Sequence, residues 1–269
     1  MQVTAAVGPS GNYYNPVGFR TELPPPITAV DEVMTQMVRF RTDRQALRQL
    51  IPSFFELPDE PVITVAHAHD IGVDWLAGRT YRLARVDTQV TYRGEEETVT
   101  GPFTMVVWES DPKPVIVGRE LQGYQKLVGN VPPHDDRDGG GSFECYEYEA
   151  RLFRGELRDL EPVSAEGLAK MQAGLDRAGH VTLGWKYIPK PEGGADVDYV
   201  TRLPMRARLA EVRQGAGTVA FDSPAWEEAP GSAHIVAALK SLPILEWRSA
   251  VATRMVDVTL PRGEARRIR

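Results

Sequence analysis

Apolar and polar residues alternate through most of this chain, and that alternation limits the fold more than any other feature of the sequence. Residues 33–41 and 101–108 alternate over their length, and residues 61–92 hold two further alternating stretches. Successive side chains of a β-strand point to opposite faces, so each stretch predicts a strand. The same character returns at residues 143–153, 155–160, 182–188, 199–203, 205–214 and 254–260. The chain is therefore predicted to be rich in short strands.

Helical spacing is confined to three short segments. Thr42 is the expected N-cap of a helix over residues 43–50, Ser164 begins a second helix, and residues 234–242 form a third. With many strands and little helix, the sequence predicts a β-rich α+β fold built on a closed or curved, mostly antiparallel sheet with a few short peripheral helices.

Composition limits the domain organisation and the classes of partner. The 269 residues show no internal repeat and no low-complexity linker, so we expect a single domain, residues 1–269, with residues 1–26 as an extended N-terminal arm. A net charge of −6 argues against binding to nucleic acid or to a membrane surface. Cys145 is the one cysteine, which excludes an intrachain disulfide. Because no signal peptide and no membrane-spanning apolar run is evident, we expect a cytoplasmic protein.

Two histidines form the first candidate site. His67 and His69 share one face of a predicted strand, and such a pair is a common beginning of a metal site. The remaining candidate ligands, which include His134, have spacings that match no known pattern. The sequence therefore favours two histidines that line a pocket or pack in the core, and we predict no metal and no cofactor.

Lys126 is the second candidate. It follows the β-branched run 114–117, which predicts a buried strand, and it stands between Tyr124 and Leu127. A lysine with apolar neighbours is usually a surface residue whose aliphatic stem covers them. The local pattern alone therefore favours an ordinary surface lysine.

A longer motif changes that interpretation. The run Gly-Arg-Glu-Leu-x-x-Tyr-x-Lys, residues 118–126, closely resembles the signature of the acetoacetate decarboxylase family, whose lysine forms a Schiff base with a ketone substrate. Residues 40–48, the pair 69–70 and residues 257–262 resemble further parts of that family, so the similarity extends over nearly the whole chain. The resemblance implies a central closed β-barrel, a homo-oligomer that is a tetramer or larger, and Lys126 as the nucleophile.

The resemblance also contains departures that bear on the reaction. The decarboxylases carry a second lysine directly after the first, and this chain has Leu127 there. A neighbouring cation is one of two ways to disfavour an ammonium ion, the other being burial, so Lys126 must depend on burial. The places of the family's pocket arginine and glutamate fall near Val33 and Tyr81. The apparatus that handles the carboxylate of a β-keto acid is therefore expected to be altered.

These departures favour a particular subgroup. Relatives with glutamine at the place of Gln122 resemble aldolase-dehydratases that act on pyruvate, and we predict a Schiff-base lyase for pyruvate or a related 2-oxo acid, with an aldehyde as second substrate, or a hydratase. The predicted catalytic residues are Lys126, Tyr81, Glu120 and Gln122, and the predicted substrate-binding residues are Arg119, Tyr124 and Leu127. The alternatives are a true acetoacetate decarboxylase, a non-catalytic small-ligand barrel, and, for Arg119 and Glu120, an ion pair that only holds the loop.

Overall fold

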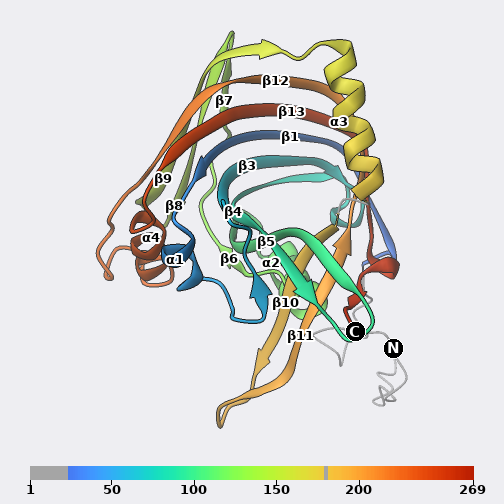
Figure 1. The fold of residues 1–269 in the computed structure, drawn as a ribbon, viewed down its shortest axis with the longest axis vertical. Coiled ribbons are helices and arrows are strands. Elements are labelled where there is room, and N and C mark those ends of the chain that lie inside the picture. The colour runs from blue at the N-terminus through green and yellow to red at the C-terminus, as the bar shows by residue number, and fades with distance from the viewer. Residues whose placement is uncertain (1–23, 179–180) are drawn as a thin grey trace, which may run out of the picture.

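The computed structural model describes residues 24–178 and 181–269, so nearly all of the predicted N-terminal arm lies outside the described residues. One mixed sheet dominates the fold (Figure 1). The strands are β1 (Ile27–Arg41), β2 (Phe55–Glu56), β3 (Val62–Val73), β4 (Arg79–Arg93), β5 (Thr98–Glu109), β6 (Lys126–Val128), β7 (Asp135–Arg137), β8 (Gly140–Glu147), β9 (Ala150–Pro162), β10 (Val181–Pro189), β11 (Ala195–Pro204), β12 (Arg206–Phe221), β13 (Glu246–Pro261) and β14 (Arg266–Arg267). The helices are α1 (Arg44–Arg48), η2 (Asp74–Leu76), α2 (Pro112–Val117), η3 (Gly118–Gln122), α3 (Ala165–Ala178), α4 (Ala233–Lys240) and η4 (Arg262–Glu264). The predicted β-rich fold with few short helices is confirmed.

The sheet is an open arch and not a closed barrel. Its 14 strands follow the order β14-β11-β10-β5-β4-β3-β1-β13-β12-β9-β8-β7, with β2 paired to β4 and β6 paired to β5. Closure would require the strands at the two ends to pair with each other, but β14 pairs with β11 and β7 with β8. The predicted closed barrel is therefore wrong. Most pairs are antiparallel, whereas β5 runs parallel to both β6 and β10.

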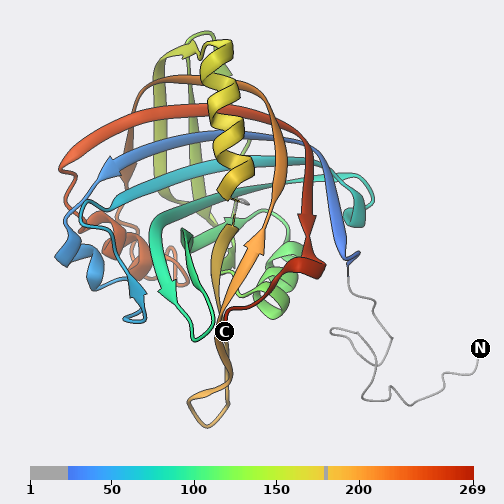
Figure 2. The same cartoon turned by 45° about the vertical axis from the view of Figure 1, so that its right-hand side comes forward.

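The longest helix lies across the arch. Figures 1 and 2 show α3 running over the curved strands beside β12, and the hairpin of β10 and β11 extending away from the rest of the sheet. Gln172 fixes the helix to β12, because its amide donates to the backbone oxygen of Ala207 and accepts from the backbone nitrogen of Leu209. No helix in the described ranges is long and apolar enough to cross a membrane.

The first helix begins one residue later than predicted. Asp43 is its N-cap, with a side chain that accepts a hydrogen bond from the backbone nitrogen of Ala46 at 2.8 Å. Thr42 instead donates its hydroxyl to the backbone oxygen of Pro243, 2.8 Å away. Asp and Thr are both common N-cap residues, so the local sequence does not show which of the two caps the helix. Asp43 is the cap here because the hydroxyl of Thr42 is bonded to Pro243, which is distant in sequence.

The segment before Lys126 is helical, so the predicted strand over residues 114–117 is wrong. Asp111 caps α2 by accepting from the backbone nitrogen of Lys113, and Pro112 occupies the first turn. A proline fits there because its ring fixes a helical φ and the missing N–H has no partner in a first turn. These two start signals outweigh the strand preference of the β-branched residues that follow.

The two faces of strand β3 carry different polar side chains. In β3, Ala68 and Asp70 line a cavity between the sheet and the α2–η3 segment, whereas His67 and His69 do not line it. His67 is instead fully buried against Phe143 of β8. The period-two alternation of one strand thus supplies two separate polar clusters, one on each face of the sheet.

Candidate active site

Lys126 is buried at the floor of this cavity. It is the first residue of β6, which lies parallel to the end of β5, and its side chain is 10% exposed. Nζ donates to Oε1 of Glu109 at 2.7 Å and to the backbone oxygen of Pro114 at 3.2 Å. The ring of Tyr124 lies 5.1 Å from Nζ. The lysine is therefore held at a defined position by groups from three different segments, unlike a surface lysine.

Two glycines of the motif make this position possible. A Cβ on Gly118 would lie 2.5 Å from Cε and 2.8 Å from Nζ of Lys126, so the lysine passes directly over the glycine backbone. Gly123 has φ 82°, and a Cβ there would meet the backbone nitrogen of Lys186 at 2.5 Å. The turn at Gly123 reverses the chain after η3. Gln122 and Lys126 therefore reach the same cavity from the two sides of this turn.

Glu109 is the immediate partner of the lysine. Its side chain is completely buried at the end of β5. Burial raises the pKa of this carboxyl, and the ammonium of Lys126 opposes part of that effect. Its second oxygen, Oε2, has no hydrogen-bond partner among the described residues. A buried carboxylate with one free oxygen accepts a proton more readily than an ordinary glutamate, so the pair is suited to moving a proton between Nζ and the carboxyl group.

A second polar group lies on β3 and β4. Burial raises the pKa of Asp70, and the hydroxyl of Tyr81 donates to its carboxylate and partly opposes the effect. Arg85 lies on the same face of β4 as Tyr81, and its Nε is 3.0 Å from Oδ2 of Asp87. The charge of Asp87 raises the pKa of Arg85. Asp70, Tyr81 and Arg85 all line the cavity. The guanidinium groups of Arg85 and Arg262 are therefore cations of its lining besides Lys126.

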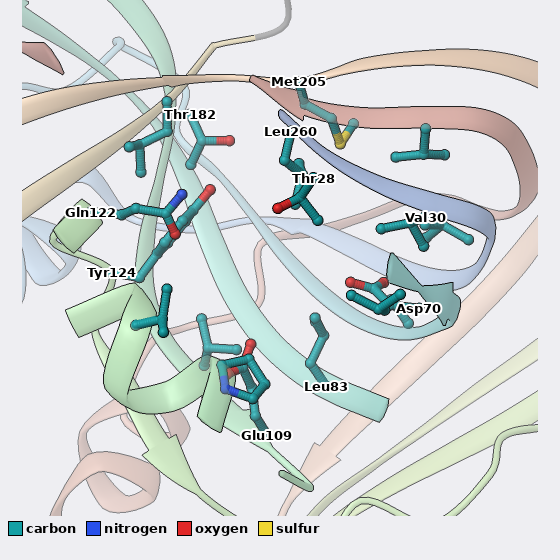
Figure 3. A pocket seen from close by; sticks show the side chains of 18 of the residues that line it. Thr28, Val30, Asp70, Leu83, Glu109, Gln122, Tyr124, Thr182, Met205 and Leu260 are labelled. Carbon is teal, nitrogen blue, oxygen red and sulfur yellow. The ribbon is translucent and has the colours of Figure 1, made fainter. Parts of the chain in front are cut away.

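Tyr124 lies between Lys126 and Thr182 of β10, and it contacts both side chains. Burial raises its pKa to about 12, although the nearby Arg85 and a hydrogen bond with the side chain of Thr182 act in the opposite direction. Figure 3 shows Tyr124 and Gln122 close together on one side of the cavity, with Thr182 above them in this view and Asp70 on the opposite side. Apolar side chains form the rest of the cavity lining, among them Val30, Leu83, Met205 and Leu260.

The structure brings together four of the residues predicted for the site. Lys126, Tyr81, Gln122 and Tyr124 line the cavity. Val33, at the expected place of the family's arginine, also lines it and offers no charge.

The other three predicted residues lie outside the lining. Arg119 is exposed and donates Nη1 to the backbone oxygen of Lys126 at 2.9 Å, so it holds the loop through the backbone and has no ion pair with Glu120. Leu127 packs against the hydrophobic core on the opposite side of β6. Glu120 is half-buried in the middle of η3. Roles for these three in catalysis or substrate binding remain predictions.

Three residues of the site were missed from the sequence: Glu109, Asp70 and Arg85. Each belongs to an alternating strand, and the alternation alone does not show which face a cavity adjoins. The register between β5 and β6 places Val107 opposite Lys126, and Glu109 two residues further on the same side. The parallel pairing of β5 with the three-residue strand β6 cannot be predicted from the sequence pattern of either strand.

Comparisons with known proteins agree with this geometry. The model of the family described as acetoacetate decarboxylase matches residues 14–264. A decarboxylase named DEC1 from Cochliobolus heterostrophus is 24% identical over 220 residues, which are 81% of this chain and 79% of that protein. An acetoacetate decarboxylase structure superposes with a TM-score of 0.72 at 19% identity, covering 91% of this chain and 90% of the other. The enduracididine biosynthesis enzyme MppR complexed with pyruvate superposes with a TM-score of 0.67 at 15% identity over 97% and 98% of the two chains.

Proposed function

The chain belongs to the acetoacetate decarboxylase family, and we propose that it is a lyase that forms a Schiff base between Lys126 and the carbonyl carbon of a 2-oxo acid such as pyruvate. The observation that carries the proposal is the buried pair of Lys126 and Glu109 at the floor of a cavity that also holds a cation, Arg85. Pyruvate is the ligand in the structure of MppR, which shares the fold. Aldol addition followed by dehydration, or hydration of an unsaturated 2-oxo acid, is the reaction class we favour.

Imine formation requires Lys126 to lose a proton, and Glu109 is positioned to accept it. The lone pair of the neutral Nζ attacks the carbonyl carbon, and the carbonyl oxygen takes up a proton to give a carbinolamine. Loss of water then gives the protonated imine. In this chain a carboxyl group with a raised pKa stands 2.7 Å from the amine, where it can take the first proton and return one to the departing hydroxyl. This arrangement does not depend on a second lysine at the place of Leu127.

The substrate carboxylate is assigned to Arg85. A guanidinium that lines a partly apolar cavity forms strong charge-assisted hydrogen bonds with a carboxylate. Asp87 forms an ion pair with Arg85, in which Oδ2 lies 3.0 Å from Nε. The N–H groups of the guanidinium can bind an incoming carboxylate.

Proton transfer at C3 is assigned to the groups on the other walls. The carboxylate of a 2-oxo acid is attached to the imine carbon itself, so its loss cannot feed electrons into the imine. The imine instead loses a proton from C3 and becomes an enamine, which attacks an aldehyde. Tyr81, hydrogen-bonded to Asp70, is a suitable proton carrier, and Gln122 offers hydrogen bonds to the second substrate.

Borohydride trapping tests this proposal. Wild-type protein incubated with pyruvate and borohydride should gain one covalent adduct in its intact mass, and Lys126→Ala should gain none. Lys113→Ala, at an exposed position on α2, is the matched control and should trap as wild type does. Wild type without an adduct for any oxo acid would instead indicate the non-catalytic ligand-binding barrel. An undiminished adduct on Lys126→Ala would exclude this lysine as the nucleophile.

A β-keto acid decarboxylase is the second candidate. The similarity to DEC1 and to an acetoacetate decarboxylase structure favours it, because both are decarboxylases by name. The same imine at Lys126 would act as the electron acceptor when a β-keto acid loses CO2. Release of CO2 from acetoacetate, compared with carbon–carbon bond formation from pyruvate and a panel of aldehydes, distinguishes the two candidates. Faster turnover of acetoacetate would establish the decarboxylase.

A further inference from the structure

Three histidines gather on the face of β3 opposite the cavity. His67 and His69 come from β3, and His134 comes from the loop that precedes β7. Their possible ligand nitrogens all lie within 4.8 Å of one another. The Nδ1 atoms of His67 and His134 are 3.2 Å apart, and the rings of His69 and His134 are stacked with centroids separated by 4.2 Å. The sequence placed the first two together and offered His134 as one of several further candidates, without a spacing that selected it.

We propose that His67, His69 and His134 bind one divalent transition-metal ion, with Zn²⁺ as the best match. Zinc binds imidazole nitrogen at about 2.0–2.1 Å, so two ligands at a tetrahedral centre are separated by about 3.3–3.4 Å. The observed 3.2 Å between the Nδ1 atoms of His67 and His134 fits that spacing. A set made only of imidazoles suits Zn²⁺, Co²⁺, Ni²⁺ or Cu²⁺ and does not suit Ca²⁺ or Mg²⁺, which require oxygen ligands.

The contacts around the rings are those expected of metal-binding histidines. His67 donates from Nε2 to the backbone oxygen of Pro132 at 2.9 Å, which leaves the lone pair of Nδ1 facing His134. A histidine that binds a metal usually donates its other N–H to such an acceptor. The backbone nitrogen of His134 donates to Nε2 of His69 over a long 3.3 Å, and a metal would replace this weak contact.

Gln36 supplies an independent observation. It stands directly opposite His67 in the pairing of β1 and β3, so the two side chains share a face, and it is 1% exposed. Its Nε2 donates to the backbone oxygen of Asp135, the neighbour of His134. Its Oε1 is buried and has no hydrogen-bond partner in the part of the chain that the structure describes. A buried acceptor of this kind is unfavourable unless it is satisfied, and a metal ion or its bound water would satisfy it.

One side of the cluster borders a second, smaller cavity. This cavity is lined by Gln36, His134, Asp136 and Arg213. Because the ion would lie on the opposite face of the sheet from Lys126, we assign it a structural role: it fixes the loop before β7 to β3.

Metal titration of the whole chain tests this proposal. Protein treated with a chelator and dialysed should bind one equivalent of Zn²⁺ by calorimetry, and Co²⁺ should give the visible absorption of a tetrahedral site. We expect His134→Ala to weaken Zn²⁺ affinity at least about 100-fold, because one of three ligands is lost. His234→Ala, on the exposed side of α4, is the matched control and should bind as wild type does.

Two results would overturn the proposal. The first is a folded wild-type protein that binds no stoichiometric Zn²⁺ or Co²⁺, and the second is His134→Ala with unchanged affinity. If His134→Ala fails to fold, His69→Gln serves in its place, since His69 is only half-buried. Trapping of pyruvate by Lys126 should be unaffected in either folded variant, so the metal site and the imine chemistry are tested separately.

Discussion

The two faces of β3 present two polar clusters that differ in how their charges are balanced. On the cavity face, Lys126 is paired with Glu109 and Arg85 with Asp87, and each cation has an acidic partner within 3.0 Å. On the other face, His67 and His69 are neutral, and a ring nitrogen of each contacts His134. Opposite charges in a buried site allow a proton to move between them, whereas neutral imidazoles keep lone pairs available to a ligand. The same alternation therefore supplies the proposed site for covalent chemistry on one face and the proposed metal site on the other.

The largest effect in this comparison is expected at Glu109. Glu109→Gln keeps the shape of the side chain but removes the group that we propose accepts the proton from Lys126. General acid–base groups typically contribute about 10²–10⁴-fold, so we expect turnover to fall by roughly 10²–10³-fold. Because the nucleophile remains, prolonged incubation with pyruvate and borohydride should still yield the adduct. Steady-state turnover and intact mass measured on the same samples separate the two steps.

Glu120→Gln is the matched control for this change, since Glu120 belongs to the same motif as Lys126 but does not line the cavity. It should retain turnover close to that of wild type. If Glu120→Gln lost activity and Glu109→Gln did not, the catalytic role would belong to Glu120, as the sequence alone predicted. The ion pair of Lys126 and Glu109 would then have no part in proton transfer.

A smaller effect is expected at Arg85. Arg85→Gln removes the fixed cation assigned to the substrate carboxylate, and a charge-assisted hydrogen bond contributes about 1.5–3 kcal/mol. KM for pyruvate should therefore rise roughly 10- to 100-fold. The control is a change of substrate: the methyl ester of pyruvate lacks the carboxylate, so wild type and Arg85→Gln should form its adduct at similar rates. An equal loss for both substrates would mean that Arg85 supports the cavity and does not bind the carboxylate.

The sequence predicted the parts of the fold that depend on local pattern. Alternation identified most strands, and the motif over residues 118–126 identified Lys126, which the structure places in the cavity. Prediction failed where a distant contact decides the outcome. Whether the sheet closes depends on its two end strands, β7 and β14, which are three and two residues long. Segments this short carry no alternation to read, and their pairing follows from the curvature of the strands between them.

The same limit applies to both polar clusters. Glu109 and Arg85 reach Lys126 and the cavity through the registers of β4, β5 and β6, which no single segment encodes. His134 is far from His67 in sequence and joins it through a loop without regular structure. A sequence can therefore show part of each cluster, and the remaining partners that determine its chemistry appear only when the strands are paired.

The smallest effect is expected at Tyr124, whose ring lies beside Lys126. Burial raises the pKa of its hydroxyl from 10.0 to about 12. The folded protein thus keeps a proton that the unfolded chain releases, so the free energy of unfolding should decline as pH rises from about 10 to about 12, by roughly 3 kcal/mol in total. Tyr124→Phe has no proton to release and should make this decline shallower. Urea unfolding at a series of alkaline pH values measures the slope, with Tyr148→Phe, 71% exposed, as the surface control. An unchanged slope in Tyr124→Phe would show that the phenol is solvated in the folded state. The cavity around Lys126 would then be open to water.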